Sequence, residues 1–230
     1  MDRQEGTEIT KSMNASFRKR WILAGILLAG FIIDACWVMT GGSAAFDDKV
    51  RLFMYSIRTP LGNAVFPVIT QMASSRWIIG WIAVLLIIPK TRKRIGLPQG
   101  ISQLATFILY KVLKAAFARP RPDSSMWLLT EHGFSFPSGH SMNGCFFYFF
   151  LIFLIRKNVA NHRIKNTLTV IFSCMPFIVA FTRLYIGVHY VTDVCGGLMM
   201  GGCCVMICTI LLDRLLQSRR NQSCSEGVRE

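Results

Sequence analysis

The segment from Thr182 to Asp193 contains the clearest candidate for a nucleophile. His189 precedes Asp193 by four positions, so the two side chains share one face if the segment is helical. The carboxylate can then accept the proton of one ring nitrogen and leave the other nitrogen free to attack. A structural network that includes Arg183 is the alternative, but such charges beside apolar runs must pair or face a polar cavity. The pattern favours a nucleophilic His189 oriented by Asp193.

A Ser-Gly pair followed by a histidine forms a second candidate site, at Ser138, Gly139 and His140. An apolar run follows directly, so these residues lie where a helix would begin. The first N–H groups of a helix, together with its dipole, bind phosphate oxygens. A simple N-cap would explain Ser138. It would not explain His140, since a histidine side chain can give or take a proton near neutral pH.

Cations mark the end of the third apolar run. Lys114 lies inside the run, and Arg121 follows between Pro120 and Pro122, which stop a helix. Extension of Lys114 toward the membrane surface is the simpler alternative. Together with Arg183, two histidines and a carboxylate, these cations suit phosphoryl transfer, in which catalysis is mostly positioning and charge neutralisation.

The elements that must position these residues are membrane helices. The chain has 230 residues, 52% of them hydrophobic, and six stretches approach the roughly 20 apolar residues of a spanning helix. We predict an all-α integral membrane bundle of six transmembrane helices, forming a single domain over residues 1–230 with its core at 21–212. A charged segment rather than a cleavage site follows the first run, so we expect no cleaved signal peptide. The six stretches are 21–39, 77–89, 97–117, 142–155, 164–181 and 191–212.

Loop charges predict the orientation of the bundle. If the helices alternate, residues 1–20, 90–96, 156–165 and 213–230 share one side and hold 17 of the 26 Lys and Arg residues. The positive-inside rule places that side in the cytoplasm, with both termini. The three candidate sites then meet at the extracytoplasmic ends of the helices, and the compact chain favours a bacterial plasma (inner) membrane. We expect the polar tail from Ser218 to be disordered.

The first extracytoplasmic segment, 41–75, mixes apolar and polar residues. Phe53, Ile57 and Val65 fit an amphipathic helix on the membrane surface that is broken at Pro60. Packing against the rest of the protein is the interpretation that we prefer for these apolar side chains.

Two other classes of protein are disfavoured by composition. The net charge of +14 comes from short clusters between apolar runs, which does not indicate nucleic-acid binding. Apolar runs contain most of the eight cysteines, so we expect neither a disulfide framework nor a structural zinc site. Those noted are Cys36, Cys145, Cys174, Cys203, Cys204 and Cys208.

The three motifs together resemble the signature of the type 2 phosphatidic acid phosphatase superfamily. Lys114, Arg121 and Pro122 match its first part, residues 137–140 its second, and Arg183, His189 and Asp193 its third. Thr182 replaces the usual serine and keeps the hydroxyl. The resemblance extends over about residues 21–212.

The resemblance implies a phosphatase that needs no metal or other cofactor. In it, His189 would attack phosphorus, Asp193 would orient His189, and His140 would protonate the leaving oxygen. Water would then hydrolyse the phosphohistidine. The phosphate would be held by Lys114, Arg121, Ser138, Gly139 and Arg183.

A site at the membrane edge favours a lipid phosphate or diphosphate as substrate. Phosphatidic acid, phosphatidylglycerol phosphate and undecaprenyl diphosphate all remain candidates, and the sequence does not indicate an oligomeric state. A phosphatase for a soluble ester is one alternative. A non-catalytic transporter or lipid-phosphate-binding protein is the other, although binding alone needs neither the pair of His189 with Asp193 nor a second histidine.

Overall fold

The computed structural model describes residues 3–226, and these residues form helices and loops with no strand among them. This confirms the all-α prediction. The longer helices are α1 (Arg3–Met39), α2 (Ala44–Ser56), α3 (Pro60–Ile69), α4 (Ser75–Ile87), α6 (Leu97–Phe117), α7 (Gly139–Asn158), α8 (His162–Tyr185) and α9 (Val191–Glu226), and α5 (Pro89–Thr91) is a single turn. Short helical turns occupy Thr70–Ala73, Arg92–Gly96 and Ser124–Met126.

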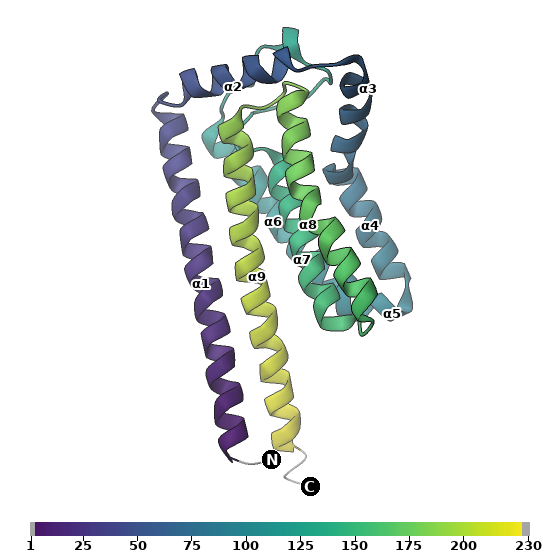
Figure 1. Cartoon of the computed structure of the whole chain (residues 1–230). Helices are drawn as coiled ribbons and strands as arrows, with labels where there is room; N and C mark the ends of the chain where they lie inside the picture. Colours follow the sequence, from purple (N-terminus) through teal and green to yellow (C-terminus); the bar gives the residue numbers. More distant parts are fainter. Residues whose placement is uncertain (1–2, 227–230) are drawn as a thin grey trace.

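The helices form one elongated bundle (Figure 1). The two longest, α1 and α9, lie side by side and bring both chain ends to the same end of the molecule. At the opposite end, α2 crosses over the bundle, and the chain then descends through α3 and α4 (Figure 1). Four elements therefore converge on the end away from the termini: the C-terminal ends of α6 and α8, and the N-terminal ends of α7 and α9.

The core is centred on α7, which contacts α4, α6, α8 and α9. Its aromatic side chains Phe146, Phe147 and Phe150 are buried. Glycines allow α9 to approach closely, because a Cβ atom on Gly197 would lie 2.8 Å from the Ser138 carbonyl oxygen and one on Gly201 would lie 2.5 Å from that of Met142. Small residues spaced four apart commonly permit this contact between membrane helices. The contact fixes the start of α7 against the start of α9.

Local sequence explains where the helices that carry the site begin and end. Helix α6 ends at Ala118, which has a left-handed backbone (φ 45°), and prolines follow at 120 and 122. Helix α7 begins after Ser138, whose hydroxyl accepts a hydrogen bond from the Ser141 N–H. The predicted runs 97–117 and 191–212 begin at the observed starts of α6 and α9, whereas α7 and α8 extend a few residues beyond the predicted runs at both ends.

Three helical segments are long and apolar enough to span a membrane: Asn14–Met39, His162–Tyr185 and Val191–Ser218. Residues Pro60–Ala73 and Ser75–Ile87 make a fourth if the pair, bent by 49°, is one broken span. Helices α6 and α7 are not among these segments; both carry charged or polar side chains such as Gln103, Lys111 and His140. Six spans therefore remain a prediction, as does a surface location for α2, which together with α3 occupies the segment predicted to be amphipathic.

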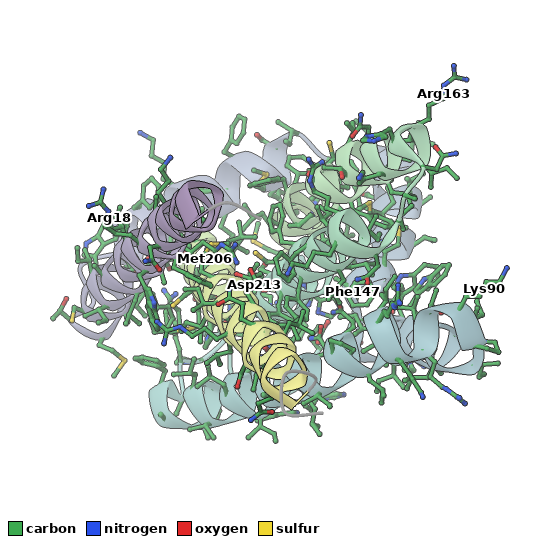
Figure 2. The ribbon with its side chains drawn as sticks, turned by 90° about the horizontal axis from the view of Figure 1, so that it is seen from below. Arg18, Lys90, Phe147, Arg163, Met206 and Asp213 are labelled. Atoms are coloured by element: carbon green, nitrogen blue, oxygen red, sulfur yellow. The ribbon has the colours of Figure 1, made fainter. Side chains whose placement is uncertain are left out.

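Ion pairs brace the end of the bundle that holds the termini. Asp213 of α9 is buried and accepts hydrogen bonds from Arg20 of α1, at 2.7 Å, and from Lys157 of α7. Figure 2 views the molecule from this end and shows Arg18, Lys90 and Arg163 directed outward.

The prediction of a disordered tail was wrong for part of its length. Helix α9 continues to Glu226, because no proline or glycine interrupts residues 213–226 and Leu, Gln and Arg favour a helix. Residues 227–230 of the predicted tail lie outside the described residues.

Candidate active site

A polar cavity of about 300 Å³ lies where the ends of the four core helices converge. Six of the eight residues predicted from the three sequence motifs line it, although they are separated by up to 75 positions in the chain. These six are Lys114, Arg121, Gly139, His140, Arg183 and His189. The other lining residues are Ala73, Ser75, Tyr110, Lys111, Thr130, Glu131, His132 and Asn143.

His189 is placed with one nitrogen toward a carboxylate and the other toward a cation. Its Nδ1 atom lies 3.2 Å from Asp193 Oδ2, and its Nε2 atom lies 3.3 Å from a guanidinium nitrogen of Arg121. Burial, with the positive charges of Arg183 and Arg121, holds the pKa of His189 well below its ordinary value. The neutral ring donates its Nδ1 proton to Asp193, an assignment that follows from the hydrogen-bond network. Its Nε2 lone pair therefore faces the side on which Arg121 lies.

Asp193 does not line the cavity but lies behind His189, fully buried and heavily bonded. Its Oδ1 atom accepts a hydrogen bond from Arg119 at 2.7 Å, and its Oδ2 atom accepts from the Tyr190 N–H at 2.9 Å and from the Ser135 hydroxyl. These bonds hold the carboxylate at the angle that His189 requires.

Arg119 was missed by the sequence reasoning. Its guanidinium joins Asp193 to Asp47 of α2, also at 2.7 Å, and Asp47 in turn accepts from the backbone and hydroxyl of Thr192. Arg119 and Arg121 flank one proline, and nothing in the sequence distinguishes which of the two faces the cavity. Asp47 lies 146 positions before Asp193, and no local pattern connects them.

Glu131 occupies the cationic part of the cavity. Its carboxylate lies 2.5 Å from a guanidinium nitrogen of Arg183 and 3.7 Å from one of Arg121. Burial alone would raise the pKa of Glu131, but the charge and hydrogen bond of Arg183, with the charge of Arg121, hold it below its ordinary value. The carboxylate is therefore ionised at neutral pH. The sequence analysis did not assign Glu131 to the site, because an isolated acidic residue in a loop carries no spacing signal.

Arg183 and Arg121 are placed to bind a second anion besides the Glu131 carboxylate. Arg183 is fully buried, and its Nε atom has no hydrogen-bond partner among the described residues. Arg121 is held by the carbonyl oxygens of Gly133, Val188 and His132. Two planar guanidinium groups fixed in this way suit a tetrahedral oxyanion.

Lys114 and Gly139 complete the lining near α6. The Lys114 ammonium donates a hydrogen bond to the Tyr110 hydroxyl at 3.0 Å. Tyr110 also explains the glycine, since a Cβ atom at Gly139 would lie 2.6 Å from its ring. Ser138 is buried outside the lining, where its hydroxyl caps α7. Its role in phosphate binding stays a prediction.

Side chains that bind metals or form disulfides are dispersed. Within the described part of the chain, no three His, Cys, Asp or Glu residues are placed to hold a metal ion. The seven cysteines that the structure describes are all free.

Comparison with known proteins assigns this chain to a family. The sequence model of the PAP2 superfamily matches residues 96–216, which include all six motif residues that line the cavity. The chain belongs to the PAP2 superfamily. Its PAP2 relatives include phosphatidylglycerophosphatase B of Bacillus subtilis (strain 168), 32% identical over 180 residues that cover 74% of this chain and 85% of the relative. Lipid A 1-phosphatase of Rhizobium johnstonii is 26% identical over 235 residues, covering 87% and 89%.

The helical arrangement also matches a solved PAP2 structure. The crystal structure of a transmembrane PAP2 type phosphatidylglycerolphosphate phosphatase from Bacillus subtilis superposes with a TM-score of 0.77. The two chains are 29% identical, and the match covers 83% of this chain and 96% of the other. Family, relatives and fold together support a membrane-embedded PAP2 lipid phosphatase.

Proposed function

We propose that this chain removes phosphate from a lipid phosphate through a phosphohistidine formed on His189, without a metal ion. The observation that carries the proposal is the placement of His189: Asp193 on one nitrogen, and on the other side a cavity lined by Arg121, Arg183 and Lys114. That arrangement supplies a nucleophile, its orienting group and the charge that a transferring phosphoryl group needs.

In the first step, His189 Nε2 attacks phosphorus and the bond from phosphorus to the lipid oxygen breaks. His140, which lines the same cavity, donates a proton to that oxygen, so the dephosphorylated lipid leaves as an alcohol or, from a diphosphate, as a monophosphate. Asp193 stabilises the charge that develops on the imidazole. The guanidinium groups neutralise the phosphoryl oxygens, and this interaction strengthens as charge shifts in the transition state.

In the second step, His140 takes a proton from a water molecule, which attacks phosphorus as the bond from nitrogen to phosphorus breaks. Inorganic phosphate is released and His189 returns to its neutral form. The lowered pKa of His189 supports the first step, since the free ring is an unprotonated nucleophile at neutral pH.

The substrate is proposed to be a lipid because the cavity is built on the ends of helices whose outer faces are apolar. Phosphatidylglycerol phosphate is the first candidate, on the strength of the two Bacillus subtilis proteins named above. Phosphatidic acid, undecaprenyl diphosphate and a lipid A phosphate are the others.

We propose six spans with both termini in the cytoplasm of a bacterial inner membrane, and residues 1–230 as one domain. Helices α6 and α7 have 21 and 20 residues, long enough at about 1.5 Å per residue to cross a hydrocarbon core of about 30 Å, and both lie against α9. The site then faces the extracytoplasmic side. Labelling of single cysteines placed in the 118–138 loop and in the 159–161 loop of intact cells, with a reagent that cannot cross the membrane, tests this orientation: only the first should react.

The activity is tested by phosphate release from purified protein in detergent with EDTA. The lipids named above are compared with a soluble phosphate ester, and His189→Ala is the control. We expect chelator-resistant release from at least one lipid, no release by His189→Ala, and an acid-labile phosphoenzyme after rapid quenching of the unmodified protein. Faster turnover of the soluble ester would favour the alternative substrate class, and lipid binding without phosphoenzyme would favour a binding or transport protein.

A further inference from the structure

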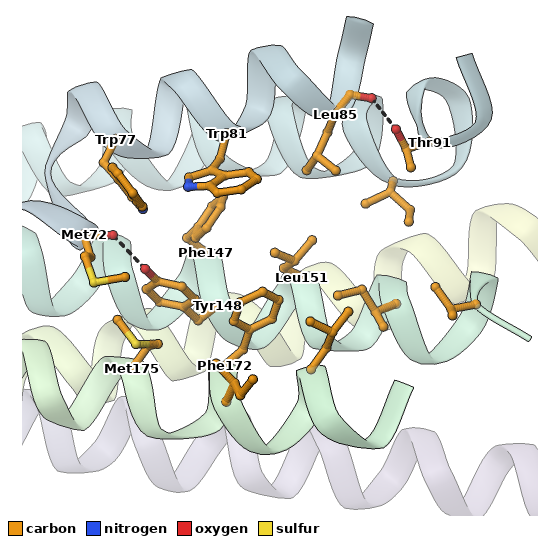
Figure 3. Close-up of a pocket in the computed structure, with 15 residues that line it drawn as sticks. Met72, Trp77, Trp81, Leu85, Thr91, Phe147, Tyr148, Leu151, Phe172 and Met175 are labelled. Atoms are coloured by element: carbon orange, nitrogen blue, oxygen red, sulfur yellow. Dashed lines mark hydrogen bonds between the residues drawn. The ribbon is translucent and has the colours of Figure 1, made fainter. Parts of the chain in front are cut away.

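Two apolar cavities flank α4 on the side of the polar cavity that faces the end of the bundle with the termini. The larger, of about 400 Å³, lies between α4, α7 and α8 and is lined by aromatic residues such as Trp81, Phe147 and Phe172 (Figure 3). It shares no lining residue with the polar cavity among the described residues. The smaller, of about 290 Å³, lies between α4, α6 and α7 and shares Ser75 and Asn143 with the polar cavity. The polar cavity and the smaller apolar cavity therefore adjoin at Ser75 and Asn143.

Two buried amides stand at this junction. Gln103 of α6 and Asn143 of α7 are only 6% and 4% exposed, and both line the smaller cavity. The Asn143 Nδ2 atom donates to the Gly139 carbonyl oxygen at 3.1 Å, which leaves its Oδ1 atom facing α6. Gln103 Nε2 donates to that Oδ1 atom at 3.2 Å. Because a carbonyl oxygen can only accept, Gly139 fixes the orientation of both amides.

The consequence is an unused acceptor. Gln103 Oε1 is shielded from water and has no hydrogen-bond partner in the described part of the chain. A buried polar atom without a partner is costly and rare. Since the orientation is fixed, the missing partner is a donor, an O–H or N–H group. Gln103 lines the smaller cavity, so a donor group held in that cavity lies beside this side chain.

Gln99 provides an internal comparison. Gln99 lies one helical turn before Gln103 in α6 and is fully buried. Its Oε1 atom also lacks a partner among the described residues. Unlike Gln103, it does not line the smaller cavity, and its Nε2 atom lies 3.5 Å from the Phe147 carbonyl oxygen. An unpaired amide oxygen is therefore not special to the junction of the two cavities. Gln103 differs from Gln99 because it also lines the cavity that adjoins the polar one.

We infer that Gln103 is a specificity-determining residue which accepts a hydrogen bond from an O–H or N–H group in the lipid, between its phosphate and its tails. The inference rests on the proposed function. Gln103 donates a hydrogen bond to Asn143, which lines both cavities, so the acceptor lies beside the junction between the two cavities. Lipids with an amide or free hydroxyl in this region are preferred, and fully esterified or prenyl backbones leave the acceptor unpaired.

The test uses two pairs of lipids that differ in one atom group. Phosphatidic acid is made with the sn-2 chain attached by an ester or by an amide, and phosphatidylglycerol phosphate is made with or without the free hydroxyl of its head-group glycerol. The donor, an N–H or an O–H, then lies at two different distances from the terminal phosphate. Phosphate release is measured for the unmodified protein, for Gln103→Met, which keeps the length but removes the acceptor, and for Gln99→Met as the matched control. The melting temperature of each variant is recorded.

We expect kcat/KM to be about fivefold higher for the lipid that carries the donor in at least one pair, a ratio near one in Gln103→Met, and the original ratio in Gln99→Met. Equal turnover of the two lipids in both pairs by the unmodified protein would overturn the inference and leave the proposed function standing, whatever the stability of the variants. A preference for the donor-bearing lipid that survives in Gln103→Met would show that Gln103 is not the acceptor. Absence of phosphate release from all four lipids would overturn both.

Discussion

In the proposed mechanism Glu131 competes with the substrate for the arginines, so its neutralisation should tighten phosphate binding. Each phosphate that enters must displace the carboxylate from Arg183, where it lies 2.5 Å from the guanidinium, and from the field of Arg121 at 3.7 Å. In Glu131→Gln the side chain keeps its shape and can still accept a hydrogen bond. It loses the charge that holds it there.

The magnitude follows from the strength of charged hydrogen bonds. Such a bond contributes about 1.5–3 kcal/mol and a neutral one about 0.5–1.5, so the substitution lowers the cost of displacement by about 1.4 kcal/mol. The side chain of Glu131 is 24% exposed, so screening by salt removes part of this difference. A value of about 1.4 kcal/mol corresponds to a tenfold tighter dissociation constant.

The assay is competitive inhibition by inorganic phosphate at low ionic strength. We expect the inhibition constant of Glu131→Gln to fall about tenfold, the KM for the lipid to fall with it, and the effect to shrink at high salt. Asp123→Asn is the control, because Asp123 is an exposed acid of the same loop that does not line the cavity. An unchanged or weakened affinity for phosphate would refute competition and leave Glu131 as a brace for the arginines.

Three further predictions concern the support of the site, its packing and its pH dependence. Arg119→Lys should lower the rate of phosphoenzyme formation about 10- to 100-fold, measured by rapid quench, because one ammonium cannot bridge Asp47 and Asp193 as the guanidinium does. Gly197→Ala should destabilise the bundle by about 1–3 kcal/mol, seen as a lower melting temperature, whereas Gly80→Ala, with open space at the Cβ position, should not. The unfolded chain binds a proton at His189 below about pH 6.5, whereas the lowered pKa keeps the folded chain unprotonated there. The free energy of unfolding should therefore fall as pH drops from 7 to 5, by up to about 1.4 kcal/mol per pH unit for this group. A His189→Asn variant should show a shallower decline.

The sequence predicted the residues of the cavity better than their supports. His189 and Asp193 are four positions apart, and Lys114, His140 and Arg183 each adjoin the end of an apolar run, so alternation of helices was enough to bring them to one end. Their supports obey no such rule. Ser135, Arg119 and Glu131 all lie in the irregular segment between α6 and α7, where side-chain direction depends on tertiary contacts rather than on a helical or strand period.

The run 97–117 predicted the bounds of α6, although polar residues such as Gln103 and Lys111 interrupt it. The number of spans was not settled in the same way. Helix α7 is buried on nearly all sides by protein, and α6 contributes polar residues to the junction of the cavities, so neither needs the uniformly apolar surface by which a spanning helix is recognised. The same burial permits Gln99 and Gln103 within an otherwise apolar run.

The bridge made by Arg119 also dictates when, during synthesis, the protein becomes competent. Its two carboxylate partners lie 72 positions before it and 74 positions after it, so the ribosome delivers Asp47 first and Asp193 only with the final helix. Until α9 is inserted, His189 has no carboxylate behind it and no fixed place on the cavity wall. If His189 is the nucleophile, as proposed, a nascent or half-inserted chain is inert toward the lipids that surround it, and hydrolysis begins only when the last helix has joined the bundle.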